Sequence, residues 1–248
     1  MPSDETWKTI GIVLLLGCFV LVAMSIAVAI DRAEVSEFEL ATKSLGLTFY
    51  RYPKGMVARL LRDSWLYPRY GARSEYLLTG PRDGFQVAMF DQYGTGVRPR
   101  GSYSDTRRTT VTCIQFTQVL LPAFVIRDGS TVDRIAGFFR QGSEVVLGDS
   151  GGYFTGHTVT SPYPDAVRNL LATGFQAVFD PLGDVHIECR EDHLLMYRPR
   201  CRPQASTRGV DIDAGIRLAR QLIDAYGKGA TAPASTPKPP PSTSYPAR

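Results

Sequence analysis

The longest uninterrupted apolar pattern lies near the N-terminus. Residues 9–30 form a run of 22 residues without a charged side chain. As a helix this run is about 33 Å long, enough to cross the hydrocarbon core of a bilayer. Trp7 and Lys8 precede it, and Asp31 and Arg32 follow it, as is typical of residues at the two membrane interfaces. The pattern predicts a single, retained transmembrane helix.

Two processing signals share features with this segment. A cleaved signal peptide has a basic start and an apolar stretch of about 7–15 residues, whereas Asp4 and Glu5 precede Lys8 here and the run is longer. The residues 15–18, ending in Cys18, resemble a lipoprotein signal, but the chain stays apolar after the cysteine instead of becoming a polar tether. The retained helix is therefore favoured over both.

Basic residues are distributed unevenly about the predicted span. The segment 1–8 carries Lys8 alone, whereas the C-terminal side carries Arg32, Lys43, Arg51 and Lys54. Basic flanks stay in the cytoplasm, and acidic residues oppose this only slightly. The chain is therefore predicted to be a single-pass protein of the cell membrane with its large domain in the cytoplasm.

Beyond the membrane, helix and strand patterns alternate. The spacing of Val35, Phe38, Ala41 and Leu45 predicts a helix over 34–45 that ends at Gly46. Further helices are predicted over 54–63, 131–140 and 164–173. Strands are predicted over 75–80, 85–91, 108–118 and 123–127, arranged as a meander with a tight turn at 81–84, and over 153–160, 175–179, 185–190 and 194–198.

The end of the chain contains a clear helix and a different kind of sequence. One apolar stripe is formed by Ile212, Ile216, Ala219, Ile223 and Tyr226, which predicts a helix packed on the sheet. Residues 228–248 are rich in Pro, Ser and Thr and are predicted to be a disordered tail. The fold class is therefore α+β: a transmembrane helix, then a mostly antiparallel sheet packed with several helices over residues 31–227.

Composition and cysteine use narrow the functional classes. Apolar residues make up 44% of the 248 residues, which excludes a wholly disordered chain. The formal net charge of +4 is small for this length, so nucleic acid is not expected as a partner. Cys113, Cys189 and Cys201 lie outside the span without CxxC spacing, and a hairpin of 184–190 with 193–199 would place Cys189 opposite Leu194. No disulfide is predicted, as suits a reducing compartment.

One motif resembles part of the active site of a known class of enzyme. Residues 148–152 read Gly-Asp-Ser-Gly-Gly, the sequence around the nucleophile of trypsin-like serine proteases. That chemistry needs a histidine base, which precedes the serine in that family. His157, His186 and His193 all follow Ser150. The motif is interpreted as a glycine-rich turn, and no catalytic residue is assigned.

Two further groups of residues are candidate binding sites. His186, Glu188 and His193, beside Asp192, are candidate metal ligands, because His186 and Glu188 share one face of a predicted strand. The competing interpretation is an exposed polar face with a turn. A glycine-rich loop over 91–108 carries candidate anion-contact residues, namely Arg98, Arg100, Arg107 and Arg108.

The order of features resembles a family of membrane-anchored bacterial proteins, frequent in actinobacteria, that carries a domain of unknown function. The resemblance covers about residues 35–226. It rests on a membrane span followed by the segments 45–49, 76–80, 87–91, 110–116, 121–126 and 194–198. It implies core strands and turns and provides no catalytic residues. Members are often strongly basic after the anchor, whereas Glu34, Glu37 and Glu39 stand there in this chain.

These patterns predict a non-enzymatic interaction or scaffold module at the inner face of the membrane. Its expected partners are the membrane bilayer, anionic lipid and another protein, and no cofactor is implied. Two alternatives stay open. One is a metal-dependent or hydrolytic enzyme, and the other is an envelope-facing domain with a glycosylated tail.

Overall fold

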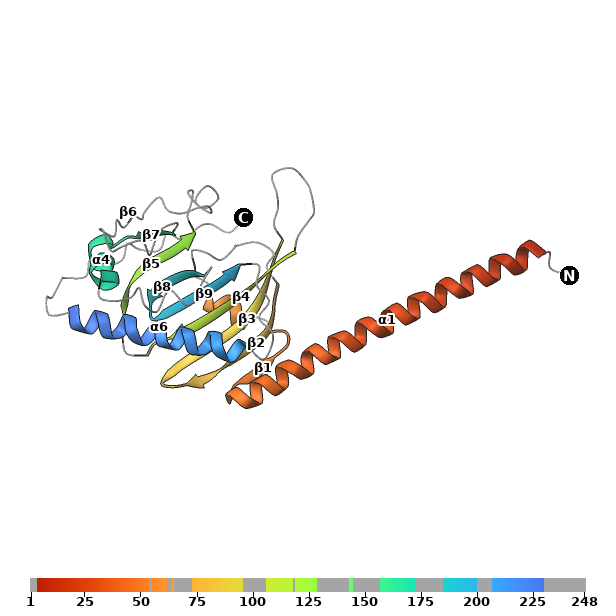
Figure 1. The fold of residues 1–248 in the computed structure, drawn as a ribbon, viewed down its shortest axis with the longest axis horizontal. Helices are drawn as coiled ribbons and strands as arrows, with labels where there is room; N and C mark the ends of the chain where they lie inside the picture. Colours follow the sequence, from red (N-terminus) through yellow and green to blue (C-terminus); the bar gives the residue numbers. More distant parts are fainter. Residues whose placement is uncertain are drawn as a thin grey trace.

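The structure is a computed structural model of the chain. It describes residues 4–53, 55–61, 64, 73–95, 106–117, 119–128, 143–144, 157–172, 185–199 and 207–229. Within these ranges, a long N-terminal helix leads into a single antiparallel sheet that is covered by shorter helices (Figure 1). The predicted α+β class, with an apolar N-terminal helix before a mostly antiparallel sheet, is confirmed.

Helix α1 (Asp4–Leu45) joins the predicted span and the predicted helix over 34–45 into one element of 42 residues. Among the described residues it is the one helix that is long and apolar enough to cross a membrane. It projects from the domain as a single rod (Figure 1). It ends at Gly46, whose φ of 68° lies in the left-handed region that glycine favours. The Leu47 N–H donates back to the Thr42 carbonyl at 3.1 Å and closes the helix end.

Nine strands of the described residues form the sheet, in the order β1-β2-β3-β4-β9-β8-β5-β7-β6. Every pair of neighbours is antiparallel. The strands are β1 (Thr48–Tyr50), β2 (Arg73–Arg82), β3 (Phe85–Thr95), β4 (Thr106–Gln115), β5 (Leu121–Asp128), β6 (Ser143–Glu144), β7 (His157–Ser161), β8 (His186–Glu191) and β9 (His193–Pro199).

The predicted meander is correct for β2, β3 and β4 and wrong for β5. The β2–β3 turn is tight, with positive φ at Asp83 and Gly84, as predicted. Strand β5, however, does not pair with β4, because the β8–β9 hairpin lies between them. The hairpin is buried on both faces, so the centre of the sheet is its stable place. Its register pairs Cys189 with Leu194, which confirms the predicted pairing.

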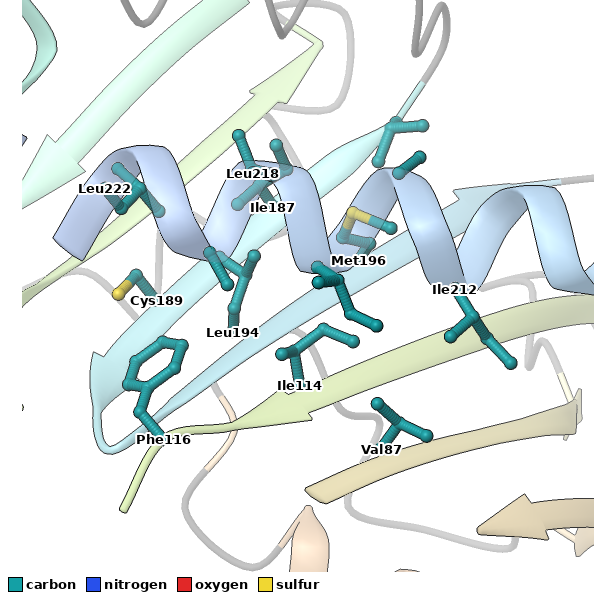
Figure 2. Packing of buried hydrophobic residues seen from close by; sticks show 14 of the residues in the cluster. Val87, Ile114, Phe116, Ile187, Cys189, Leu194, Met196, Ile212, Leu218 and Leu222 are labelled. Carbon is teal, nitrogen blue, oxygen red and sulfur yellow. The ribbon is translucent and has the colours of Figure 1, made fainter. Parts of the chain in front are cut away.

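Helices α4 (Pro164–Ala172) and α6 (Arg208–Gly229) pack on one face of the sheet. Figure 2 shows Ile212, Leu218 and Leu222 of α6 lying over the strands that carry Ile114 and Met196. A Cβ on Gly215 would stand 3.1 Å from both of those side chains, so the glycine permits close contact between helix and sheet. The predicted apolar stripe is thus confirmed, and it is wider than predicted because Ala214, Leu218 and Leu222 are also buried.

The opposite face has its own apolar cluster under the short helix α2 (Met56–Leu60). This helix is shorter than the one predicted over 54–63. Its Val57 is buried against Phe90 and Val111 of the sheet in that cluster. The centre of the sheet is therefore covered on both faces. This explains why consecutive residues of its central strands are apolar, since successive side chains point to opposite faces.

Several predictions fall outside the described residues. These are the helix over 131–140, the turn at 148–152, the strand over 175–179, Cys201 and residues 230–248 of the tail. Residues 228 and 229, predicted as the start of the tail, belong to α6.

Candidate functional site

The last turns of α1 are packed onto the sheet through an aromatic stack. The ring of Phe38 lies parallel to those of Tyr76 and Phe49, with centroids 4.6 Å and 5.9 Å away. Phe38 is 3% exposed, and Thr42, one turn later, is also buried. The membrane helix is thus part of the hydrophobic core of the domain and not a tether beside it.

A buried ion pair connects α6 to the part of the sheet against which Phe38 packs. Arg208, at the start of α6, donates from Nη2 to Asp91 Oδ2 at 2.6 Å, and both side chains are 0% exposed. The Thr110 hydroxyl donates to Asp91 Oδ1 at 2.7 Å. The guanidinium of Arg208 also lies 4.3 Å from the centre of the Phe38 ring. One cation therefore links α1, α6 and the sheet.

The opposite face of the sheet carries a second buried polar network around Glu188. Ser64 Oγ donates to Glu188 Oε2 at 2.7 Å, and Arg190 Nε donates to Oε1 at 2.9 Å. A hydroxyl has one proton, so Tyr197 OH donates in turn to Ser64 Oγ, at 2.7 Å. The network fixes Ser64, 124 residues away in sequence, against β8 and β9.

The Tyr197 phenol and the Cys113 thiol, close to this network, are held in their neutral forms. Burial, followed by the charge of Glu188, raises the pKa of Tyr197 well above its ordinary value. Burial also raises the pKa of Cys113 to about 12, with a smaller contribution from Asp192. A buried neutral thiol or phenol is a poor nucleophile at pH 7. These groups therefore stabilise the core and do not form a reactive centre.

The candidate metal ligands lie on one sheet face, as predicted, but do not converge. In the backbone register of the hairpin, His186 lies opposite Tyr197, and His193 lies opposite Arg190. Arg190 is four residues after His186, so the two histidines are about 13 Å apart along the strands, at 3.3 Å per residue. The Glu188 oxygens are occupied by Ser64 and by the cation of Arg190. Within the described ranges, no group of three His, Cys, Asp or Glu residues is placed to hold a metal ion.

The expectation of an exposed polar face is wrong for Glu188, which is 0% exposed. It holds for the turn, where His193 Nδ1 is 2.7 Å from Asp192 Oδ1 and the Asp192 side chain is 48% exposed. Burial works to raise the pKa of Asp192, but hydrogen bonds from His193 and Gln115 outweigh it and lower that pKa. The turn contains a local hydrogen bond between His193 and Asp192, and Glu188 is part of the core.

The arginine-bearing loop is placed by the strands that flank it. Arg98 and Arg100 lie outside the described residues. Arg107 and Arg108 belong to β4, where their backbones pair with Gly94 and Tyr93. The candidate anion-contact loop therefore starts and ends at the Tyr93 end of the sheet.

The same end of the sheet lies against the middle of α1. Arg51, just after β1, forms a salt bridge with Asp31, the first charged residue after the apolar run. Tyr52 follows, with the guanidinium of Arg51 5.0 Å and that of Arg73 5.6 Å from its ring centre. Arg73 pairs with Tyr93 across β2 and β3. We call Arg51, Tyr52, Arg73 and Tyr93, with the backbone positions of Arg107 and Arg108, the rim.

Sequence reasoning missed Arg51, Tyr52 and Arg73 as members of a site. The position of Arg51 beside Asp31 could have been predicted from the lengths of the helix and strand between them. A helix covers about 21 Å from Asp31 to Leu45, and a strand of five or six residues after Gly46 covers about the same distance in the opposite direction. A turn at Gly46 therefore returns the chain to the level of Asp31 at residue 51.

The fold is similar to that of a protein of known structure. No protein-family model matches the chain, and no curated protein matches it. The crystal structure of the mycobacterial trehalose monomycolate transport factor A, TtfA, is similar to this structure with a TM-score of 0.51 and 15% sequence identity. The alignment covers 78% of this chain and 94% of that one. At this identity the likeness shows that the two proteins share an α+β fold.

Proposed function

We propose that this protein is a non-enzymatic interaction module that α1 holds at the inner face of the cell membrane. The observation that carries the proposal is the continuity of α1, which runs without a break from the apolar segment to Leu45 and enters the core through Phe38. A flexible linker lets a domain tumble, whereas a packed helix holds the domain at a fixed position relative to the membrane segment. Such an arrangement suits a protein that presents one surface to partners in or on the membrane.

Three further features support the proposal. Basic residues are more frequent after the span than before it, which favours the cytoplasmic side. The Glu188 carboxylate is hydrogen-bonded within the core, and the described residues include no group of three His, Cys, Asp or Glu placed to hold a metal ion. The shared fold of a transport factor agrees with a non-enzymatic role. Membership of the membrane-anchored bacterial family with a domain of unknown function, and contact with anionic lipid and a protein partner, belong to the same proposal.

Orientation is tested by cysteine labelling in cells. Cys113 is 2% exposed with a raised pKa, so it is a poor target. Ala166 on α4 is exposed, and Ala166→Cys in a Cys18→Ser, Cys201→Ser background is the better probe. We expect an impermeant maleimide to label it only after permeabilisation, and to label a matched Ser3→Cys variant in intact cells. Labelling of position 166 in intact cells would place the domain on the envelope side.

The non-enzymatic assignment is tested by metal analysis of the purified full chain in detergent. We expect zinc and iron far below one equivalent. Stoichiometric metal that is lost in both His186→Ala and His193→Ala would overturn the assignment in favour of a metal-dependent enzyme. Because neither histidine pairs with Glu188 across the hairpin, these variants should keep the fold, and far-UV circular dichroism is the control.

The interaction role is tested by photo-crosslinking in cells. Leu40, Leu120 and Val210 are large apolar side chains, 64–65% exposed, outside the predicted membrane segment. A photoreactive residue at each position of the full chain should give a discrete protein adduct from at least one of them. Absence of a protein adduct from all three, with the protein at its normal level in the membrane, would contradict an interaction module.

A further inference from the structure

The position of the apolar run on α1 indicates where the bilayer surface lies relative to the domain. The apolar run of α1 ends at Ile30, so Asp31 and Arg32 stand at the boundary between hydrocarbon and headgroups. The helix continues for about 21 Å beyond that point to Leu45. Strand β1 then brings the chain back, and Arg51 pairs with Asp31. The rim is therefore at the level of the headgroups.

Neighbouring contacts extend the rim away from α1. The guanidinium groups of Arg51 and Arg73 lie against the Tyr52 ring. In the strand register, Arg73 lies opposite Tyr93, and Tyr93 lies opposite Arg108. Tyr52 is 51% exposed, and the Arg73 side chain is 67% exposed. Four chain segments thus place aromatic and basic residues along one end of the sheet. Tyrosine prefers the membrane interface, and arginine binds phosphate with paired N–H donors.

Charge is concentrated in the two segments that start and end at the rim. Residues 51–73 and 94–108 together contain ten basic and two acidic residues, a net charge of +8. The whole chain has a net charge of +4, so the rest of the protein is net negative. Within the described part of the rim, Asp31 and Glu75 pair with Arg51 and Arg73. The positive charge of the sequence is therefore concentrated in the two segments that begin and end at the rim.

We propose that the rim is a lipid-binding surface, in which Arg51, Tyr52 and Arg73 contact the phosphates of anionic headgroups in the leaflet that α1 leaves. This inference rests on the proposed membrane attachment and adds the residues and the lipid chemistry. The contact gives the domain a second point of attachment beside α1. Two points of attachment fix the tilt of the sheet on the membrane, which one helix alone does not fix.

The test uses the full chain in nanodiscs, where α1 keeps the protein in the membrane whatever the lipid. A fluorophore is attached at Tyr50→Cys, next to the rim, in the Cys18→Ser, Cys201→Ser background. Quenching by a lipid with a nitroxide on its headgroup reports contact with the surface. We expect stronger quenching in discs containing phosphatidylglycerol than in discs of phosphatidylcholine alone.

Charge reversal identifies the residues responsible. Arg73→Glu should lower the population in headgroup contact at least fivefold in phosphatidylglycerol discs, because the loss of one basic residue at an anionic surface already costs about 1 kcal/mol. Arg168→Glu, an exposed residue of α4, is the matched control and should have no effect. Equal quenching in the two lipids, or no effect of Arg73→Glu in a folded protein, would overturn the inference. Because a nanodisc offers the domain only the leaflet it already faces, this result is independent of orientation in cells.

Discussion

The two faces of the sheet each contain a buried charged network, but the networks are built differently. On the α6 face, Asp91 and Arg208 are both 0% exposed and pair directly. On the α2 face, Glu188 is 0% exposed while the Arg190 side chain is 19% exposed and can reach water. Removing one partner of a fully buried pair leaves a charge without solvent, which is the costlier defect. The face that holds the membrane helix therefore depends on the more sensitive network.

The largest effect is expected from Asp91→Asn. The substitution keeps the volume of the side chain and removes the charge that balances Arg208, so it should lower the free energy of unfolding by about 4 kcal/mol. Urea unfolding of the full chain in detergent measures it. Asp213→Asn is the control, because its partly exposed pair with Arg82 at 2.9 Å should contribute under about 1 kcal/mol. Equal losses for the two variants would contradict the greater sensitivity of the fully buried pair.

The second-largest effect is expected from Phe38→Ala, which removes the main contact of α1 with the α6 face of the sheet. Loss of the stack on Tyr76 and of the contact with Arg208 should cost about 3 kcal/mol. Amide exchange should increase first in residues 34–45 of α1, with the centre of the sheet still protected. Leu40→Ala, on the exposed side of the same helix, is the control and should change neither quantity. Uniform loss of protection across the sheet would show that the helix is not a separable layer.

Glu188→Gln is the corresponding change on the α2 face. The amide keeps an acceptor for Ser64, and Arg190 can turn toward solvent, so the expected loss is about 2 kcal/mol. The measurement is again urea unfolding, and Glu191→Gln at the exposed end of β8 is the control. A loss as large as that of Asp91→Asn would remove the distinction between the two networks.

The smallest effect is a pH dependence shared by both faces. Burial raises the pKa of Cys113, on the α2 face, from 9.0 to about 12, and burial also raises the pKa of Cys189, on the α6 face. A thiol with a raised pKa in the folded state supports stability below pH 9, and this support is lost as the pH rises, because the unfolded chain ionises first. From pH 8 to pH 10 we expect Cys113→Ala to lose about 1 kcal/mol less than the native chain. Parallel pH profiles would contradict the assigned burial.

Local patterns of the sequence predicted most of the elements but not the long-range pairing. Periodicity located α6 and the register of the β8–β9 hairpin, including Cys189 opposite Leu194. It placed β5 beside β4, because apolar alternation identifies a strand without identifying its neighbour. The correct order depends on which hairpin is buried on both faces.

The candidate sites show the same limit. Strand parity correctly put His186 and Glu188 on one face, but the burial of Glu188 depends on Ser64, which no local pattern connects to it. Arg51 and Arg73 are ordinary polar residues in the sequence and acquire a common position only when β1 returns beside α1. Contacts between residues far apart in sequence therefore decide both the core and the rim.

Both lateral edges of the sheet end in very short strands. Within the part of the chain that the structure describes, strand β1 has three residues and β6 has two, so these two strands offer few edge N–H and C=O groups to another chain. A protein anchored by one helix diffuses in two dimensions, where copies collide in similar orientations far more often than in solution. Long open edges under these conditions would template strand exchange between neighbours. The short terminal strands are thus poor templates for edge-to-edge pairing between neighbouring copies.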